Sequence, residues 1–467
     1  MDRNTITGLV LMMALLIGYN WYNAPTEEEL RAQQEEQAQV DDQLSTQDNQ
    51  QADEQRDPQQ AQNGNGQKDD NSIPQNEISK DPEPEEEFFT LSNDQLKVEF
   101  SSIGGLPVDA VLLDKYKRYG TDEPVRLWAK GKSSMDISWS ASSGPSSLSD
   151  LHFHIKKSND ISLELRSEFQ QGGFVEIRHQ LEGYQVKTTF EFNDVNEGDM
   201  QFEWQATGLS NEKGIDWERQ HSAIYYLEED EERDYLSDGQ ADEETIENKL
   251  EWFSFKQNYF SALVSSPTPF GQGAVLENIV PEENQEYVMT YRATVPYDGS
   301  QALHFYFGPN DLTNLEATGL EEVGRVIDYG WWIFGWVNRN LILPLYGFIA
   351  KYIGNMGLIV LLLTLIIKSV LFPITWKNFM SSAKMRVLRP DLQEINERHK
   401  DDAMARQQET MELYRKTGVN PMAGCLPALL QMPILYAMFR FFPSNIDLRG
   451  ESFLWADDLG AYDSILD

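Results

Sequence analysis

Long apolar runs separate the membrane-associated parts of this chain from the parts that face water. A helix needs roughly 20 predominantly apolar residues to cross a bilayer, and the runs at 354–375 and 421–443 meet that length. Each run predicts one transmembrane helix. The second contains Pro427 and Pro433, which membrane helices tolerate because neighbouring groups satisfy the freed backbone carbonyls.

A further apolar run, Thr5 to Tyr22, lies near the start of the chain. Such a run is typical of either a cleaved signal peptide or an uncleaved anchor. A signal peptidase needs small residues at both of its specificity positions, and Tyr22 ahead of Ala24 does not supply them. We therefore predict an N-terminal transmembrane anchor at 1–23.

The segment 88–312 has a different pattern, in which apolar and polar side chains alternate, as in Leu96, Val98 and Phe100. Alternation with period two predicts β-strands that bury one face. Many short antiparallel strands in a segment of this length favour two packed sheets. We predict an all-β sandwich domain at 88–312.

Residues 24–87 are rich in Gln, Asp, Glu, Asn and Pro and nearly lack large apolar side chains. Such a composition cannot bury enough apolar surface to offset chain entropy. We predict a disordered acidic linker at 24–87. An acidic recruitment tail is the alternative interpretation.

Aromatic side chains are concentrated at 325–340, where Trp331, Trp332 and Trp336 lie close together beside a predicted span. Tryptophan favours the boundary between hydrocarbon and water. We predict an amphipathic helix at 325–340 that lies in this interface. The alternative is an aromatic core helix.

The first long span is followed by a polar region, 378–418, with apolar residues at three- and four-residue intervals, including Met385, Leu388 and Ile395. This spacing predicts amphipathic helices, and Pro390 should kink or restart the first of them. We predict a helical hairpin at 378–418.

Charge sets the expected topology. The chain has 76 acidic against 38 basic residues and a formal net charge of -38, so duplex nucleic acid is an improbable ligand. From Lys377 to Lys416 basic residues outnumber acidic ones, nine to seven, and the positive-inside rule assigns this hairpin region to the cytoplasm. The N-terminus should then also be cytoplasmic, whereas the β domain and the segment 444–467 should lie on the opposite side.

Motifs of cofactor or metal chemistry are missing from the sequence. It contains no Cys/His cluster with metal-ligand spacing, Gly-rich phosphate loop or nucleophile elbow. The single cysteine, Cys425, cannot form an internal disulfide and suits a packing role. The acidic stretch Glu228 to Asp234 reads as a solvated loop rather than a glycosidase pair or a calcium site. We predict no cofactor, no metal and no enzymatic activity.

One polar stripe interrupts the first long span. Lys368 and Thr364 are four residues apart, so they share one face of a helix. Lys368 is close enough to the Pro373 end for its ammonium to reach the headgroups, which would make it an interfacial anchor. The alternative is a positive charge in a wet cavity, helped by Thr364 and by Gln431 of the second span. Gln431 could instead hydrogen-bond a neighbouring helix.

The order of these segments and two motifs together resemble the YidC/Oxa/Alb family of membrane protein insertases, in its bacterial form with a large periplasmic domain. The motifs cover, first, Lys384, Met385, Arg386, Leu388 and Pro390, and second, Asn420, Pro421, Gln431, Met432 and Pro433. The resemblance extends over essentially the whole chain. It implies a polytopic α-helical membrane protein with a large β-sandwich periplasmic domain and a cytoplasmic helical hairpin.

The resemblance also implies a site. Family members carry a positive charge in a hydrophilic groove open to cytoplasm and lipid, and by motif this charge is Lys368, with Thr364 and Gln431 as groove residues. Many members have arginine where this chain has Lys368. The family continues into further spans beyond the position of Asp467, so we expect the given sequence to be a fragment.

The function implied is that of an insertase and chaperone of the bacterial inner membrane, acting alone or with the Sec translocon. Its partners would be nascent membrane proteins, the lipid bilayer and, at the cytoplasmic hairpin, ribosomes or targeting factors. Two other classes compete with this interpretation. A membrane-anchored carbohydrate-binding or carbohydrate-active sandwich would show an aromatic platform with paired carboxylates, and a transporter subunit would show inverted repeats of its spans.

Overall fold

The computed structural model describes residues 85–140, 146–169, 173–193, 200–281, 286–299, 302–400, 402–418 and 426–461. The predicted anchor at 1–23 and all but the last residues of the predicted linker at 24–87 lie outside these ranges. All of the described residues belong to one compact unit, Pro82–Asp467.

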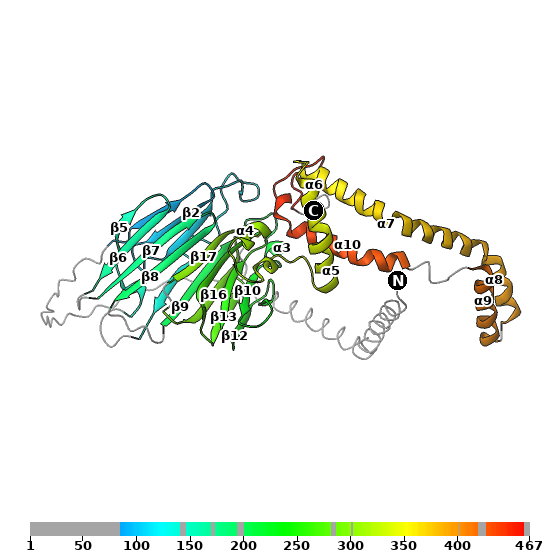
Figure 1. Ribbon diagram of the computed structural model, residues 1–467, viewed down its shortest axis with the longest axis horizontal. Coiled ribbons are helices and arrows are strands. Elements are labelled where there is room, and N and C mark those ends of the chain that lie inside the picture. The colour runs from blue at the N-terminus through cyan, green and yellow to red at the C-terminus, as the bar shows by residue number, and fades with distance from the viewer. Residues whose placement is uncertain are drawn as a thin grey trace, which may run out of the picture. The chain divides into compact units, whose positions relative to one another are not determined.

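The first part of this unit is built from strands (Figure 1). Their bounds are β1 (Phe88–Ser92), β2 (Leu96–Ser101), β3 (Pro107–Leu112), β4 (Ser134–Ser138), β5 (His154–Ser158), β6 (Ser162–Glu168), β7 (Phe174–Glu182), β8 (Gln185–Asn193), β9 (Met200–Leu209), β10 (Ala223–Glu228), β11 (Asp234–Tyr235), β12 (Asp242–Ile246), β13 (Leu250–Lys256), β14 (Phe260–Phe270), β15 (Ala274–Ile279), β16 (Tyr287–Tyr297) and β17 (Ala302–Pro309).

The strands form three antiparallel sheets. The largest has nine strands in the order β11-β10-β13-β14-β17-β8-β7-β6-β5, and the second has five in the order β12-β15-β16-β9-β4. A third sheet joins β1, β2 and β3. Strand β2 shows the predicted alternation, because Leu96, Val98 and Phe100 are all buried between less buried neighbours.

Aromatic side chains pack the two larger sheets against each other. Trp204 on β9 of the five-stranded sheet is fully buried, and its ring centroid lies 4.4 Å from that of Phe255 on β13 and 6.0 Å from that of Phe305 on β17. Both partners belong to the nine-stranded sheet. Truncating a buried tryptophan of this kind costs about 3–5 kcal/mol. The predicted all-β sandwich is therefore confirmed, and these rings form its core.

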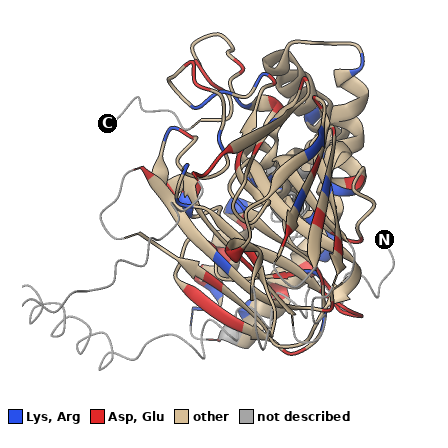
Figure 2. Cartoon of the chain, turned by 90° about the vertical axis from the view of Figure 1, so that its left-hand side faces the viewer, with Lys and Arg blue, Asp and Glu red and all other residues tan. Residues whose placement is uncertain are grey.

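The solvent side of the nine-stranded sheet carries charges of both signs (Figure 2). Glu176 on β7 is the centre of one network and pairs with Lys156 on β5 at 2.7 Å, Arg178 at 2.5 Å and Arg166 on β6 at 3.4 Å. Three cations around one carboxylate link the neighbouring strands β5, β6 and β7.

Helices make up most of the second part of the unit. Two short helices, α3 (Ile215–Arg219) and α4 (Leu312–Glu316), lie within and directly after the strands of the β domain. The later helices are α5 (Trp332–Val337), α6 (Leu343–Ala350), α7 (Met356–Val387), α8 (Arg389–Arg398), α9 (Ala403–Thr417) and α10 (Leu426–Ser444). A π-helical turn, Asn338–Ile342, connects α5 to α6. Among the described residues, one helix is long and apolar enough to cross a membrane, over Met356–Lys377.

Two helix boundaries differ from the predicted segments. The aromatic helix begins at Trp332 instead of 325, because Gly330 adopts a left-handed conformation (φ 93) that no right-handed helix accommodates. Helix α7 continues past the end of the apolar run to Val387, since its polar part contains good helix formers and no glycine. Pro390 stands in the first turn of α8, so it restarts the helix there.

A buried carboxyl group on α3 binds the turn between β9 and α3. Glu218 is fully buried and accepts hydrogen bonds from Ser210 Oγ at 3.0 Å and from the backbone N–H of Asn211 at 2.9 Å and of Glu212 at 3.3 Å. Burial, reinforced by the nearby Glu212 carboxylate, raises the pKa of Glu218 to about 8. Glu218 therefore holds a proton in the folded protein at neutral pH.

Replacing Glu218 by glutamine should flatten the pH dependence of folding. The raised pKa means that the stabilisation from Glu218 is complete below its ordinary value of 4.5 and is lost as the pH rises through about 8. In that window one such group changes the free energy of unfolding by up to about 1.4 kcal/mol per pH unit. Denaturant unfolding between pH 6 and 8, followed by tryptophan fluorescence, should show this slope in the parent chain and lose it in Glu218→Gln. Substitution of the exposed Glu231 is the control, and equal slopes in all three proteins would contradict the assignment.

Candidate functional site

Helix α7 has one buried stripe and, beside it, the predicted polar stripe. Ile359, Leu363 and Ile367 recur every fourth residue and are buried. Thr364 and Lys368 each follow a stripe residue by one position, about 100° around the helix, and both are exposed. Within the described part of the chain, Lys368 forms no hydrogen bond or ion pair. The helix therefore carries a cation with no protein partner next to its packing face.

Helix α10 returns alongside α7 in the opposite direction (Figure 1). Gln431 on this helix is half-buried. At a rise of 1.5 Å per residue, Lys368 lies about 18 Å from the start of α7 at Met356, and Gln431 lies about 20 Å from the end of α10 at Ser444. In an antiparallel pair these distances place the two side chains at similar depths.

The three groove residues of the sequence prediction are not joined by direct contacts. Among the hydrogen bonds of the described residues, none connects Gln431 with Thr364 or Lys368. The structure thus arranges them on two helices that are in contact with each other. Their roles stay a prediction.

A polar junction fixes the C-terminal end of α10 to the segment ahead of the aromatic helix. Arg440 pairs with Asp328 at 3.0 Å, and the hydroxyl of Ser444 donates to the Asp328 carbonyl at 2.9 Å. The fully buried Asn338 donates from Nδ2 to the carbonyls of Tyr329 at 2.6 Å and Ala437 at 2.8 Å. Sequence reasoning missed this junction, although Arg440 in an apolar run was a signal.

The aromatic helix leaves its tryptophans uncovered. Trp331, Trp332 and Trp336 are 64%, 63% and 63% exposed, whereas Val337 and Asn338 on the other side are buried. A helix with this division of faces suits the membrane interface, where the rings meet headgroups and acyl chains.

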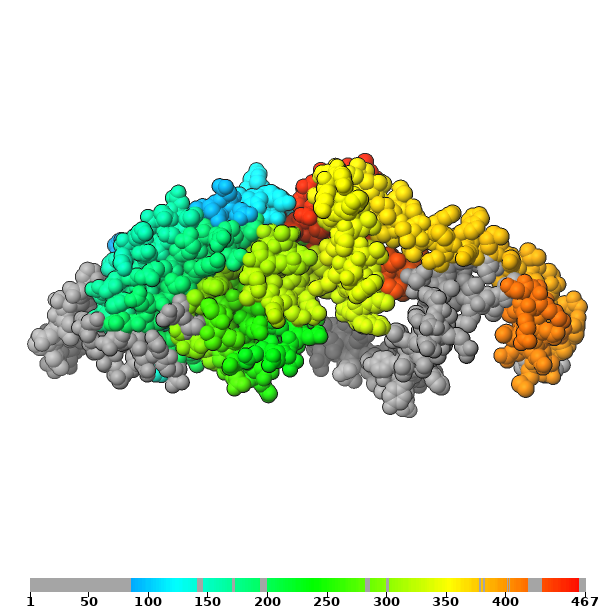
Figure 3. All heavy atoms as spheres, viewed as in Figure 1, coloured from blue at the N-terminus to red at the C-terminus, as the bar shows by residue number. Residues whose placement is uncertain are grey.

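The polar helices α8 and α9 pack on each other as a hairpin (orange in Figure 3). Leu388 and Ile395 are buried at their contact. Arg398 and His399 both reach Glu409 across it, at 2.6 and 2.5 Å. Of the residues that the family motif singles out, Lys384, Arg386 and Pro390 are exposed and Met385 is half-buried. The basic side chains are thus free to meet a partner.

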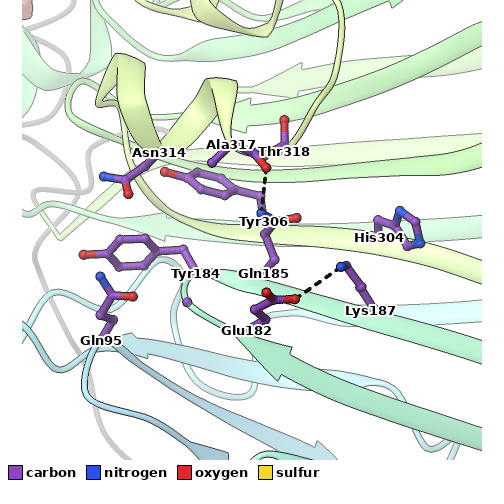
Figure 4. Close-up of a pocket in the computed structure, with 11 residues that line it drawn as sticks. Gln95, Glu182, Tyr184, Gln185, Lys187, His304, Tyr306, Asn314, Ala317 and Thr318 are labelled. Atoms are coloured by element: carbon purple, nitrogen blue, oxygen red, sulfur yellow. Dashed lines mark hydrogen bonds and ion pairs between the residues drawn. The ribbon is translucent and has the colours of Figure 1, made fainter.

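The β domain has a hollow of about 450 Å³ between the β7–β8 turn and α4 (Figure 4). The rings of Tyr184 and Tyr306 that line it are buried, and their hydroxyls donate to Asp114 and to the Pro309 carbonyl. Its carboxylate, Glu182, pairs with Lys187 at 3.3 Å. These lining residues do not form an exposed aromatic platform with paired carboxylates. The hollow therefore does not favour the carbohydrate alternative.

The acidic stretch Glu228 to Asp234 is engaged in ion pairs of its own. Glu229 pairs with Lys249 at 3.6 Å and Glu232 with Arg325 at 3.4 Å. Within the described ranges, no group of three or more His, Cys, Asp and Glu side chains could hold a metal ion.

Comparison with known proteins adds independent findings. A family model described as YidC periplasmic domain matches residues 89–343, and one described as 60Kd inner membrane protein matches residues 348–466. A protein of Parabacteroides distasonis named membrane protein insertase YidC is 34% identical over 100% of this chain and 78% of its own length. A protein of the same name from Phocaeicola vulgatus is 32% identical over 100% of this chain and 77% of its own length.

A solved galactose mutarotase-like protein from Lactobacillus casei is similar to part of the chain. The TM-score is 0.32 at 11% identity, and the match covers 48% of this chain and 100% of that one. A likeness this low supports no argument about function.

Asn338→Ala should loosen the junction between the aromatic helix and α10. It removes the two hydrogen bonds that the buried Nδ2 donates to the carbonyls of Tyr329 and Ala437, each worth about 0.5–1.5 kcal/mol. Asn340→Ala is the matched control, because Asn340 is exposed and donates only to Trp336 of its own helix at 2.9 Å. Thermal unfolding in detergent should show a lower midpoint for Asn338→Ala and an unchanged one for Asn340→Ala. Equal midpoints would mean that the bridge contributes nothing.

Proposed function

Because the chain belongs to the YidC family of membrane protein insertases, we propose that it inserts client helices into the inner membrane through a groove between α7 and α10. The observation that carries this proposal is Lys368, an exposed ammonium on an otherwise apolar span. A lysine at the middle of a bilayer costs at least about 2.5–3.5 kcal/mol unless water or a counter-charge solvates it. The groove supplies the water.

The charge acts on the part of the client that is hardest to move. A client segment that must cross to the outer side is often acidic, and its carboxylates gain Coulomb energy near Lys368 that partly replaces their hydration. Thr364, one helical turn away, and Gln431, at similar depth on α10, add hydrogen-bonding groups beside the path. The insertase therefore lowers the barrier for the polar segment.

The apolar part of the client supplies the driving force itself. Each CH₂ group transferred from water to lipid contributes about 0.8 kcal/mol, so a hydrophobic helix gains far more than thermal energy by leaving along the lipid side of α7. The exposed side chains Leu361, Leu365 and Phe372 lie on nearly the same face of α7 as Lys368, so this face offers a client apolar contacts beside the charge. No nucleotide hydrolysis is needed for this step.

The proposed topology follows from charge. The hairpin α8–α9, together with the basic end of α7 that leads into it, is cytoplasmic, and the β domain and the segment after α10 are periplasmic. The exposed Lys384 and Arg386 give the hairpin a surface for ribosomes, targeting factors or nascent chains. The aromatic helix marks the outer membrane interface. Cooperation with the Sec translocon and a chaperone role for larger clients belong to the same proposal.

Lys368→Ala should impair insertion of a Sec-independent client with an acidic outer segment. We expect at least a tenfold lower rate, which corresponds to about 1.4 kcal/mol of lost barrier stabilisation. Lys368→Arg keeps the charge and should retain activity. Protease protection of the client in reconstituted vesicles measures the rate. Lys377→Ala, an exposed lysine at the end of the same apolar run, is the control, and full activity of Lys368→Ala would leave only a headgroup anchor.

Deleting the hairpin from Asp391 to Lys416 should abolish insertion while leaving the protein in the membrane. The deletion removes α8 and α9 but keeps α7 and α10, so the span and its charge stay in place. Membrane fractionation establishes the second condition, and growth of cells that depend on this copy measures the first. Normal growth of such cells would reject a role for the hairpin.

A further inference from the structure

A segment that follows α10, here called the outer segment (residues 445–461), connects the membrane helices to the β domain. It starts with a 3-10 turn, Ile446–Leu448, capped by Asn445, whose side chain accepts from the Asp447 N–H. Leu448 and Ile446 are buried. Arg449 follows directly, and its side chain makes four hydrogen bonds to residues of the β domain.

The contacts of Arg449 surround its guanidinium. Nε donates to the two carboxylate oxygens of Glu212 at 2.8 and 3.0 Å. Nη2 donates to the carbonyls of Lys117 at 2.8 Å and Asn211 at 3.1 Å, and the ring of Phe260 lies 5.1 Å away. The side chains of Arg449 and Glu212 are only 7% and 9% exposed. Together these groups form a largely buried binding site for one arginine side chain.

A second contact holds the far end of the outer segment. The hydroxyl of Tyr259 donates to the Gly460 carbonyl at 3.1 Å. The carboxylate of Asp458 accepts from the N–H groups of both Gly450 and Gly460, at 2.9 and 2.7 Å. The outer segment is thus closed on itself while both of its ends rest on the β domain.

The same segment also touches the membrane helices. The hydroxyl of Tyr346 on α6 donates to Asp447 Oδ2 at 3.1 Å. The ring of Phe453 packs so closely on Gly357, in the first turn of α7, that a Cβ there would overlap it. One short segment therefore joins the β domain to the ends of α6, α7 and α10.

We propose that the turn carrying Glu212 is the docking site of the β domain for the outer segment, and that Arg449 is the positioning residue through which this domain holds the outer ends of α7 and α10. A buried ion pair adds little net stability compared with apolar packing, but it strongly disfavours any arrangement that separates its members. Arg449 lies in the part of the chain that follows α10, and Glu212 lies between β9 and α3. The pair therefore selects one placement of the helices on the domain. Only the activity measurement below rests on the proposed insertase function.

Hydrogen exchange of the whole chain in lipid nanodiscs tests the docking directly. Arg449→Ala should accelerate exchange at least tenfold in the outer segment and in the 209–218 turn, and leave β13 and β14 unchanged. Arg449→Lys should fall between, because an ammonium keeps the charge and loses the fork of donors. Arg292→Ala is the matched control, since Arg292 pairs with Glu277 on the same domain, away from the helices.

Two further variants separate docking from folding and from activity. Arg449→Ala could unfold the β domain by leaving the Glu212 carboxylate buried and unpaired. The double variant Arg449→Ala with Glu212→Gln removes that charge. It should show the same faster hydrogen exchange in the outer segment while the strands stay protected. Unchanged exchange in the outer segment of this double variant would overturn the docking site. For positioning, Arg449→Ala should reduce client insertion at least threefold while Arg449→Lys restores part of it.

The outcomes distinguish this proposal from the proposed function. Faster exchange with normal insertion would overturn the positioning role of Arg449 and leave the insertase intact. Loss of activity in Lys368→Ala with normal exchange in the outer segment would support the groove charge independently. If neither variant affects insertion, the proposed groove fails, whereas the exchange result still decides whether Arg449 docks the outer segment.

Discussion

Removing a charge from water costs several kcal/mol unless a counter-charge, hydrogen bonds or retained water replace the lost solvation. That cost decides where this chain places its ionisable side chains. Arg449 and Glu212 enter the interior together. Glu218 is buried with hydrogen-bond donors instead of a cation beside it, and burial raises its pKa. Lys368 has no partner among the described residues and stays exposed on α7. The first two arrangements build structure, and the third leaves a charge available to another molecule.

The polar links gather at one end of the helices. Within the described residues, the hydrogen bonds and ion pairs that join α10 to other elements involve Ala437, Arg440 and Ser444, all in its outer half. Apolar contacts are non-directional and let helices slide or tilt at small cost. Directional polar bonds fix the outer ends in register, and the part of α10 that carries Gln431 is held by packing. In the proposed groove, such a pair of helices is anchored at the end that carries Arg440 and Ser444 and can adapt near Gln431 to clients of different shape.

The sequence predicted the elements better than their connections. Alternation at Leu96, Val98 and Phe100 and the apolar run of α7 are local patterns, so the sandwich and the span could be predicted from them. The position of Lys368 on the face of α7 also followed from spacing. The pairing of Glu212 with Arg449 could not be predicted in this way. The two residues are far apart in the sequence, and a contact between distant segments produces no periodic pattern. The raised pKa of Glu218 depends on its burial and on the nearby Glu212 carboxylate, and neither can be read from the sequence alone.

The contrast between Arg449 and Lys368 bears on the choice of cation at each place. A guanidinium offers five donors in a rigid plane. Arg449 uses that geometry to bind one carboxylate and two backbone carbonyls, which are fixed partners within the same chain. An ammonium is a compact charge on a flexible stem, and it attracts carboxylates from many directions without demanding one geometry. The proposed groove would receive clients of different sequence, so the second property is an advantage there. Lysine at 368 therefore fits the proposed attraction of acidic client segments, just as arginine at 449 fits a site that holds one partner.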